Sequence, residues 1–203
     1  MKHRGRGLTL IELAVALAVI AILIMQAAPG FKAWIQNTQT RTETDSIQSG
    51  LQLARSEAIR RNRSVMFWLT NPPQADWLVG CSNPVGAGAQ PEATGDCPGS
   101  ATGGGVPPAG PPYNWIQRQA AADQQTANAQ VAVTPVGATN VTFNSLGMVT
   151  TNIDGTASIT KIDVSNQFVT GPLARPLQIQ VSGGQIRMCD PNLVLATDPR
   201  GCQ

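Results

Sequence analysis

The sequence is poor in charge and in aromatic side chains. Of its 203 residues, 13% are charged and 4% are Phe, Trp or Tyr, and the formal net charge is +2. A total so close to zero gives no reason to expect binding to a polyanion. Glycine and proline are plentiful instead, at 20 and 15 residues, which predicts many turns between short strands.

Histidine is almost absent. His3 is the only one, and it lies in a short basic segment that we expect to be removed. A mature chain without histidine lacks the commonest metal ligand and general base, so it cannot hold a Ser-His-Asp triad. Asp154-Gly155 and Asp190-Pro191 are typical of turns, and no carboxylate cluster suggests a calcium site. We therefore expect no enzymatic activity, no metal and no cofactor.

The four cysteines include no C-x-x-C pair, which argues against a zinc or thioredoxin-like site. They are Cys81, Cys97, Cys189 and Cys202. Their even number fits two disulfides in an oxidising compartment. Three connectivities are possible. We favour the local pairs Cys81–Cys97 and Cys189–Cys202, because each would hold a segment with little else to order it.

Polar side chains are missing from residues 13–25. With its apolar flanks this stretch reaches about 21 residues, enough to span a membrane as a helix. Residues 1–7 are short, polar and basic, which predicts that this end stays in the cytoplasm. Glu12 is costly in such a helix unless it finds a partner, and no basic residue lies between Leu8 and Gly30. An ordinary signal peptide or signal anchor is the alternative, although residues 25–28 form only a weak cleavage site.

The segment Gly7-Leu-Thr-Leu-Ile-Glu12-Leu resembles the class III signal of type IV pilins. This resemblance implies a prepilin peptidase that cuts after Gly7 and methylates the new N-terminal amine at Leu8. It also implies that Glu12 neutralises the N-terminal amine of a neighbouring subunit, and that Pro29 is the helix-kinking proline common in pilins. Leu8 departs from the usual phenylalanine, a position that these peptidases tolerate. Loss of the leader would leave 11 of the 14 basic residues against 12 acidic ones.

The helix should continue beyond the membrane over residues 30–62. One helical face carries a periodic apolar set, Ile47, Leu51, Ala54 and Ala58. Asn62 suits a C-cap, and the Pro29-Gly30 pair should kink or loosen the helix. Four arginines crowd its last turns: Arg55, Arg60, Arg61 and Arg63. Because Glu57 lies within one turn of two of them, we expect local pairing rather than a nucleic-acid site.

Three internal segments indicate which group of pilin-like proteins the chain resembles. Leu51–Val65 is similar to the end of the helix in the GspH/FimT group of minor pseudopilins. Val141–Gly147 and Gln185–Pro191 are similar to a strand-and-turn segment and to the last strand of that group. The resemblance implies a minor pilin or pseudopilin that enters the inner membrane once and assembles into, or primes, a filament. We favour a type IV pilus from the Cys-Asp-Pro ending; the pseudopilus of type II secretion is the alternative.

The expected fold class is α+β, with a long N-terminal helix packed on an antiparallel β-sheet domain. The expected parts are a leader (1–7), a transmembrane helix (8–29), an amphipathic helix (30–62) and a periplasmic β-rich domain (63–203). Strands are expected at 65–70, 77–81, 130–134, 139–144, 157–165, 176–182 and 185–189. Gly183-Gly184 should form a two-residue hairpin turn, and residues 82–112 an exposed Gly/Pro-rich loop. Residues 114–132 fit a short helix or a loop, and after Asp190-Pro191 we expect the chain to leave the sheet.

DNA capture for natural transformation is a third possible role, because some relatives on the FimT side bind DNA through a basic C-terminal tail. Only Arg187 matches their pattern clearly, and Gln185 stands where another arginine is expected. Residues 185–203 have no net charge, whereas polyanion binding needs several uncompensated cations. DNA is therefore a possible but not favoured partner, with Arg187 and Arg200 as first candidates and Arg175 behind them. The expected partners are the prepilin peptidase, other pilin subunits and membrane lipid.

Overall fold

The structure is a computed structural model that describes residues 9–81, 114–124, 126–152 and 154–202. It forms two compact units, the first ending at Ile35 and the second beginning at Gln36. Helix α1 (Leu10–Arg61) supplies the described part of the first unit apart from Thr9, and it continues into the second. Pro29 and Gly30 lie inside this helix.

Helix α1 begins and ends with recognisable caps. At the start, the hydroxyl of Thr9 accepts a hydrogen bond from the backbone N–H of Glu12 at 3.3 Å, as an N-cap does. At the end, Asn62 has a φ of 51°, and the Arg63 N–H reaches the Ala58 carbonyl at 3.1 Å. This is the Schellman arrangement, so the predicted C-cap at Asn62 is confirmed.

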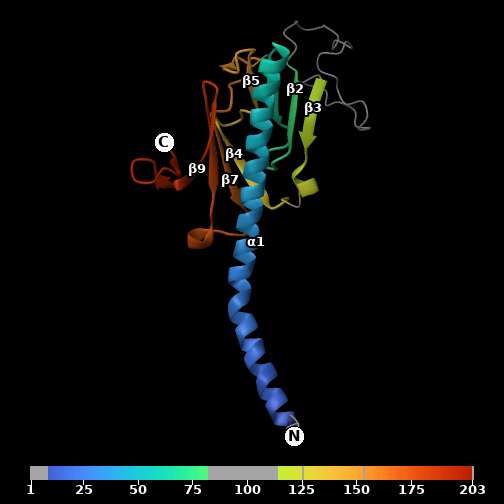
Figure 1. The fold of residues 1–203 in the computed structure, drawn as a ribbon, viewed down its shortest axis with the longest axis vertical. Helices are drawn as coiled ribbons and strands as arrows, with labels where there is room; N and C mark the ends of the chain where they lie inside the picture. The colour runs from blue at the N-terminus through green and yellow to red at the C-terminus, as the bar shows by residue number, and fades with distance from the viewer. Residues whose placement is uncertain (1–8, 82–113, 125, 153, 203) are drawn as a thin grey trace, which may run out of the picture. The chain divides into compact units, whose positions relative to one another are not determined.

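Two five-stranded sheets complete the second unit (Figure 1). The first has the order β3-β2-β1-β5-β6 and comprises β1 (Val65–Leu69), β2 (Trp77–Cys81), β3 (Asn114–Gln119), β5 (Asn140–Phe143) and β6 (Val149–Thr150). The second has the order β10-β9-β8-β7-β4 and comprises β4 (Ala129–Thr134), β7 (Lys161–Asn166), β8 (Leu177–Ser182), β9 (Gln185–Val194) and β10 (Gly201–Cys202). The described strand pairs are antiparallel except β9 with β10, which is parallel.

One hydrophobic core joins the second-unit part of α1 to both sheets. The predicted apolar face of the helix is fully buried: Ile47, Leu51, Ala54 and Ala58. Gly50 lies on the same side, where an added Cβ would come within 3.0 Å of the Phe67 ring and 3.1 Å of the Trp77 ring. The missing side chain therefore lets the helix lie close against β1 and β2.

The strand predictions are right in most places, but they miss the two-residue strand β6 and differ from the structure at three further points. The Gln/Ala-rich middle of residues 114–132 does form a short helix, the 3₁₀ turn η2 (Ala121–Gln124), but the residues before it form strand β3, which was not predicted. Strand β7 begins at Lys161 rather than at 157. The preceding residues instead bridge other strands, since the Ile159 N–H donates to the Asn140 carbonyl and the Thr160 N–H to the Thr134 carbonyl.

The third error concerns the C-terminal tail, which does not leave the sheet after Asp190-Pro191. Strand β9 continues to Val194, and β10 pairs with it through Gly201–Asp190 and Cys202–Val194. The predicted hairpin is confirmed, with Ser182 opposite Gln185 and a φ of 64° at Gly183. The Gly/Pro-rich loop expected at 82–112 lies outside the described residues.

Candidate assembly helix and C-terminal region

The first unit exposes a long apolar surface in which Glu12 is the one charged side chain from Leu10 to Met25. Side chains of α1 from Leu10 to Met25 are all exposed. Within the described part of the chain, α1 is the helix long and apolar enough to cross a membrane. An apolar helix surface of this length needs lipid or other apolar helices around it.

Glu12 lies in the first turn of this helix. Its backbone N–H is capped by Thr9, so Thr9-Leu-Ile-Glu12 is a capping-box sequence that the sequence reasoning missed. In the described residues the Glu12 side chain forms no ion pair, and Lys32 is the next charged residue along the helix. The residues of the expected cleavage site, Gly7 and Leu8, lie outside the described residues, and so does the side chain of Pro29.

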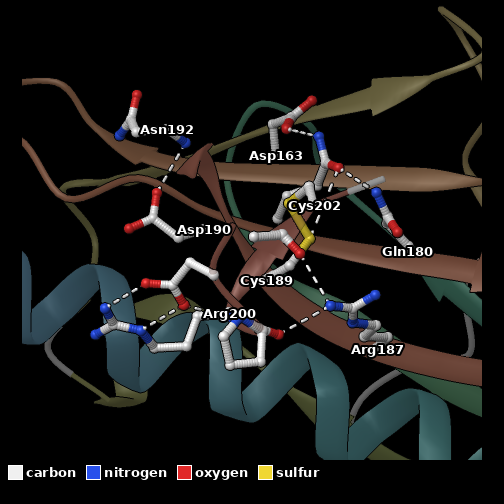
Figure 2. The surroundings of a disulfide bond; sticks show 12 residues. Asp163, Gln180, Arg187, Cys189, Asp190, Asn192, Arg200 and Cys202 are labelled. Carbon is white, nitrogen blue, oxygen red and sulfur yellow. Dashed lines mark hydrogen bonds and ion pairs between the residues drawn. A yellow bond between two sulfur atoms is a disulfide. The ribbon is translucent and has the colours of Figure 1, made fainter. Parts of the chain in front are cut away.

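A disulfide joins the end of the chain to strand β9 (Figure 2). The sulfurs of Cys189 and Cys202 are 1.99 Å apart, and their Cα atoms 5.1 Å. Cys81, at the end of β2, is also disulfide-bonded. Its expected partner, Cys97, lies outside the described residues.

The two arginines first considered for DNA both bond within this region (Figure 2). Arg187 donates from Nη2 to the carbonyls of Pro199 and Gly201, at 3.0 and 2.9 Å. Arg200 forms a two-pronged pair with Asp198, at 3.1 and 2.8 Å. Hydrogen bonding to Arg200 lowers the pKa of Asp198 to about 2. These arginines therefore hold the C-terminal loop, and Arg175 likewise donates to the carbonyls of Pro172 and Ala174.

The alternation of apolar and polar residues along β8 predicts that Gln178 faces solvent, but the structure buries its amide. Gln178 is only 9% exposed. It donates to Asp163 at 2.6 Å and accepts from Gln180 at 2.8 Å. The Cys189 sulfur lies 4.0 Å from its oxygen. Because the disulfide region covers this face, the strand is buried on both sides near its start.

The end of α1 pairs its own charges. Glu57 accepts from Arg60 at 2.6 and 3.0 Å and from Arg61 at 2.6 Å, so the predicted local pairing is confirmed. The hydrogen bond from Arg60 is the main cause that lowers the pKa of Glu57.

A tight turn between β5 and β6 docks on this end of the helix. The Gly147 carbonyl accepts from Arg55 Nε at 3.2 Å. Gly147 has a φ of 73°, and an added Cβ would lie 2.7 Å from the end of Ile59. Only glycine satisfies both constraints, which explains physically why the Val141–Gly147 segment ends as it does.

Comparison with known proteins gives two family matches. A family model described as "Type II transport protein GspH" matches residues 43–185. A model of the prokaryotic N-terminal methylation motif matches residues 2–25. The chain belongs to the GspH family. This GspH-family chain is thus a minor pilin or pseudopilin of the type IV pilus and type II secretion class, a class of structural subunits with an N-terminal anchor.

Two solved structures are similar to this GspH-family chain, both of the type IV minor pilin FimU of Pseudomonas aeruginosa (strain PAO1). The crystal form in space group P21 has a TM-score of 0.45 at 14% identity, covering 76% of this chain and 91% of FimU. The form in space group P65 has a TM-score of 0.41 at 14% identity, covering 73% and 90%. No curated protein matches the sequence.

Proposed function

We propose that this chain is a minor pilin that enters the inner membrane, is cut after Gly7 by a prepilin peptidase, and then assembles into or primes a type IV pilus. The observation that carries the proposal is the exposed apolar part of α1 with Glu12 in its first turn, which lies within the segment matched by the methylation-motif model. Such a helix suits lipid before assembly and neighbouring helices afterwards.

Glu12 supplies the electrostatic step of this proposal. Cleavage after Gly7 creates a new amine at Leu8 and makes Glu12 the fifth residue of the mature chain. Among apolar helices the attraction between opposite charges is much stronger than in water, and an unpaired charge is correspondingly costly. The Glu12 carboxylate of one subunit therefore pairs with the Leu8 amine of its neighbour, which sets the register between the two helices.

The second unit lies in the periplasm in this proposal. Its disulfides favour an oxidising compartment, and the basic segment before α1 favours a cytoplasmic N-terminus. A single crossing then connects the two sides.

Mass spectrometry of the protein extracted from membranes tests the processing step. The expected N-terminus is Leu8, carrying one added methyl group. An N-terminus at Met1, or one beyond Ala28, would show that the chain is not processed as a pilin.

A pseudopilin of type II secretion is the second candidate, and the description of the matching family model favours it. Deletion of the gene separates the two. Loss of surface pili with normal secretion of exoproteins supports the pilus, whereas retained pili with blocked secretion supports the pseudopilus.

A further inference from the structure

Residues 167–175, in the loop between β7 and β8, expose large apolar side chains. Phe168 is 67% exposed and Leu173 is 55% exposed. Leu173 ends a short 3₁₀ turn, η3 (Gly171–Leu173), which has no buried residue. The loop contains no acidic residue and ends in the cation Arg175. Exposed apolar side chains beside a cation suit binding to a surface that is both apolar and negatively charged.

Both ends of this loop are fastened to the first residues of the second unit. The Asn37 amide donates to the Leu173 carbonyl at 2.9 Å, and its oxygen accepts from the Arg175 N–H at 3.0 Å. At the other end, Asn166 donates to the Gln36 carbonyl at 3.5 Å and accepts from the Phe168 N–H at 2.9 Å. The loop thus lies at the point where the chain enters the second unit.

That point is close to the end of the membrane span along the chain. Phe31 and Trp34 are exposed on α1 with ring centroids 5.9 Å apart, and Lys32 lies between them. Aromatic and basic residues after an apolar stretch mark a membrane interface. Whatever the angle between the two units, the three residues from Trp34 to Asn37 span at most about 10 Å. The headgroup layer is therefore within reach of the loop.

Charge favours the same surface. No acidic residue occurs from Leu13 to Thr42 or in the loop itself, whereas Lys32 and Arg175 are both cationic. We propose that the loop of residues 167–175 is a second membrane contact, with Phe168 and Leu173 in the interface of anionic phospholipids and Arg175 at their phosphates. This inference rests on the proposed membrane anchor. Two apolar side chains give weak, reversible binding, which orients the domain before assembly and releases it when the subunit leaves the bilayer.

The full-length protein in nanodiscs tests this contact. The discs contain phosphatidylglycerol and phosphatidylcholine whose acyl chains are brominated near the headgroup, so they quench only tryptophans that enter the interface. Phe168→Trp should add emission that the brominated lipid quenches several-fold more strongly than the emission added by Leu146→Trp. Leu146 is a matched control, because it is 77% exposed on the turn that bonds Arg55, about 27 Å along α1 from Asn37.

Arg175→Gln, made in the Phe168→Trp protein, should reduce the quenching in discs with phosphatidylglycerol and leave it unchanged in pure phosphatidylcholine. Equal quenching at positions 168 and 146 would overturn the contact. So would protection of residue 168 in assembled filaments without quenching in discs, since the occupant would then be a neighbouring subunit. Failure of the wild-type chain to insert in discs would instead contradict the membrane anchor.

Discussion

Glu43 is a carboxyl group in the core of the second unit. It is fully buried on α1, and among the described residues its Oε1 has no hydrogen-bond partner. Its Oε2 contacts the hydroxyl of Thr126, which also lies 3.0 Å from the Ala121 carbonyl. A hydroxyl has one proton, so both contacts are satisfied together when Thr126 donates to Ala121 and a protonated Glu43 donates to Thr126. Burial is the main cause that raises the pKa of Glu43, and the nearby Asp76 raises it further against the Thr126 hydrogen bond.

This carboxyl should make the domain less stable as the pH rises. A folded-state pKa above the unfolded one means that folding takes up a proton, so stability is complete below the unfolded pKa and falls as pH rises through the folded one. Glu43→Gln should remove that fall and so stabilise the domain at pH 7, because an amide takes up no proton on folding.

Urea unfolding of the second unit from pH 4 to pH 8 measures this effect. Glu57→Gln is the matched control, because the pKa of Glu57 is lowered and its contribution has the opposite sign, being lost as pH falls. An unchanged pH dependence in Glu43→Gln would exclude Glu43 as its source.

Gly147 gives a second prediction at the scale of one residue. Gly147→Ala should destabilise the domain by about 1–3 kcal/mol, because the new Cβ meets Ile59 and the backbone has a positive φ. Gly155→Ala is the control, since Gly155 has nearly the same φ of 72° but open space around it. The difference between the two urea midpoints isolates the contact with the helix. Equal losses would mean that the turn does not press on Ile59.

At the scale of elements, the sequence predicted those features that depend only on residues close together along the chain. The buried face of α1, the Asn62 cap and the Gly183 hairpin each follow from a few neighbouring residues, and all three are confirmed. Strand β10 could not be predicted, because two residues show no periodicity and the expected Cys189–Cys202 disulfide does not by itself specify that the tail pairs with β9. Gln178 was misplaced because periodicity within β8 does not reveal that the region around Cys189 covers this face.

The C-terminal element depends on Arg187, which leads to a third prediction. Arg187→Met should speed hydrogen exchange at the amides of Asp190 and Gly201, because two hydrogen bonds from a charged donor would be lost. Arg200→Met is the control: its partner, Asp198, is two residues away in the same exposed loop. Mass-spectrometric exchange of both variants decides the matter, and equal protection in Arg187→Met and wild type would mean that the disulfide alone holds β10.

At the scale of the whole molecule, Glu12 should separate membrane insertion from assembly. Glu12→Ala removes a carboxylate from an apolar helix, so insertion should be retained or improved. Entry into filaments should fall several-fold, because the neighbour's amine loses its partner. Asp45→Ala is the control, since Asp45 is an exposed carboxylate of α1 paired with Arg41 at 3.8 Å. Sheared filaments and membranes are compared by immunoblot, and normal recovery of Glu12→Ala in filaments would contradict the pairing.

Binding of duplex DNA by the second unit should be weak, no tighter than about 1 μM near physiological salt. The expectation follows from how the cations are used: Arg187 and Arg200 bond within the C-terminal loop, and Arg60 pairs with Glu57. A cation that already has a partner in the protein releases fewer counterions from DNA. Any residual binding should therefore be electrostatic and weaken as the salt concentration rises, with a slope set by the number of cations that still contact phosphates.

Gel-shift titration at two salt concentrations measures this, with an Arg187→Gln, Arg200→Gln double variant expected to weaken residual binding. Loss of binding in an Arg60→Gln, Arg61→Gln variant instead would place the contact at the end of α1, and tight binding that resists salt would refute the expectation, because it would require contacts to bases rather than to phosphates.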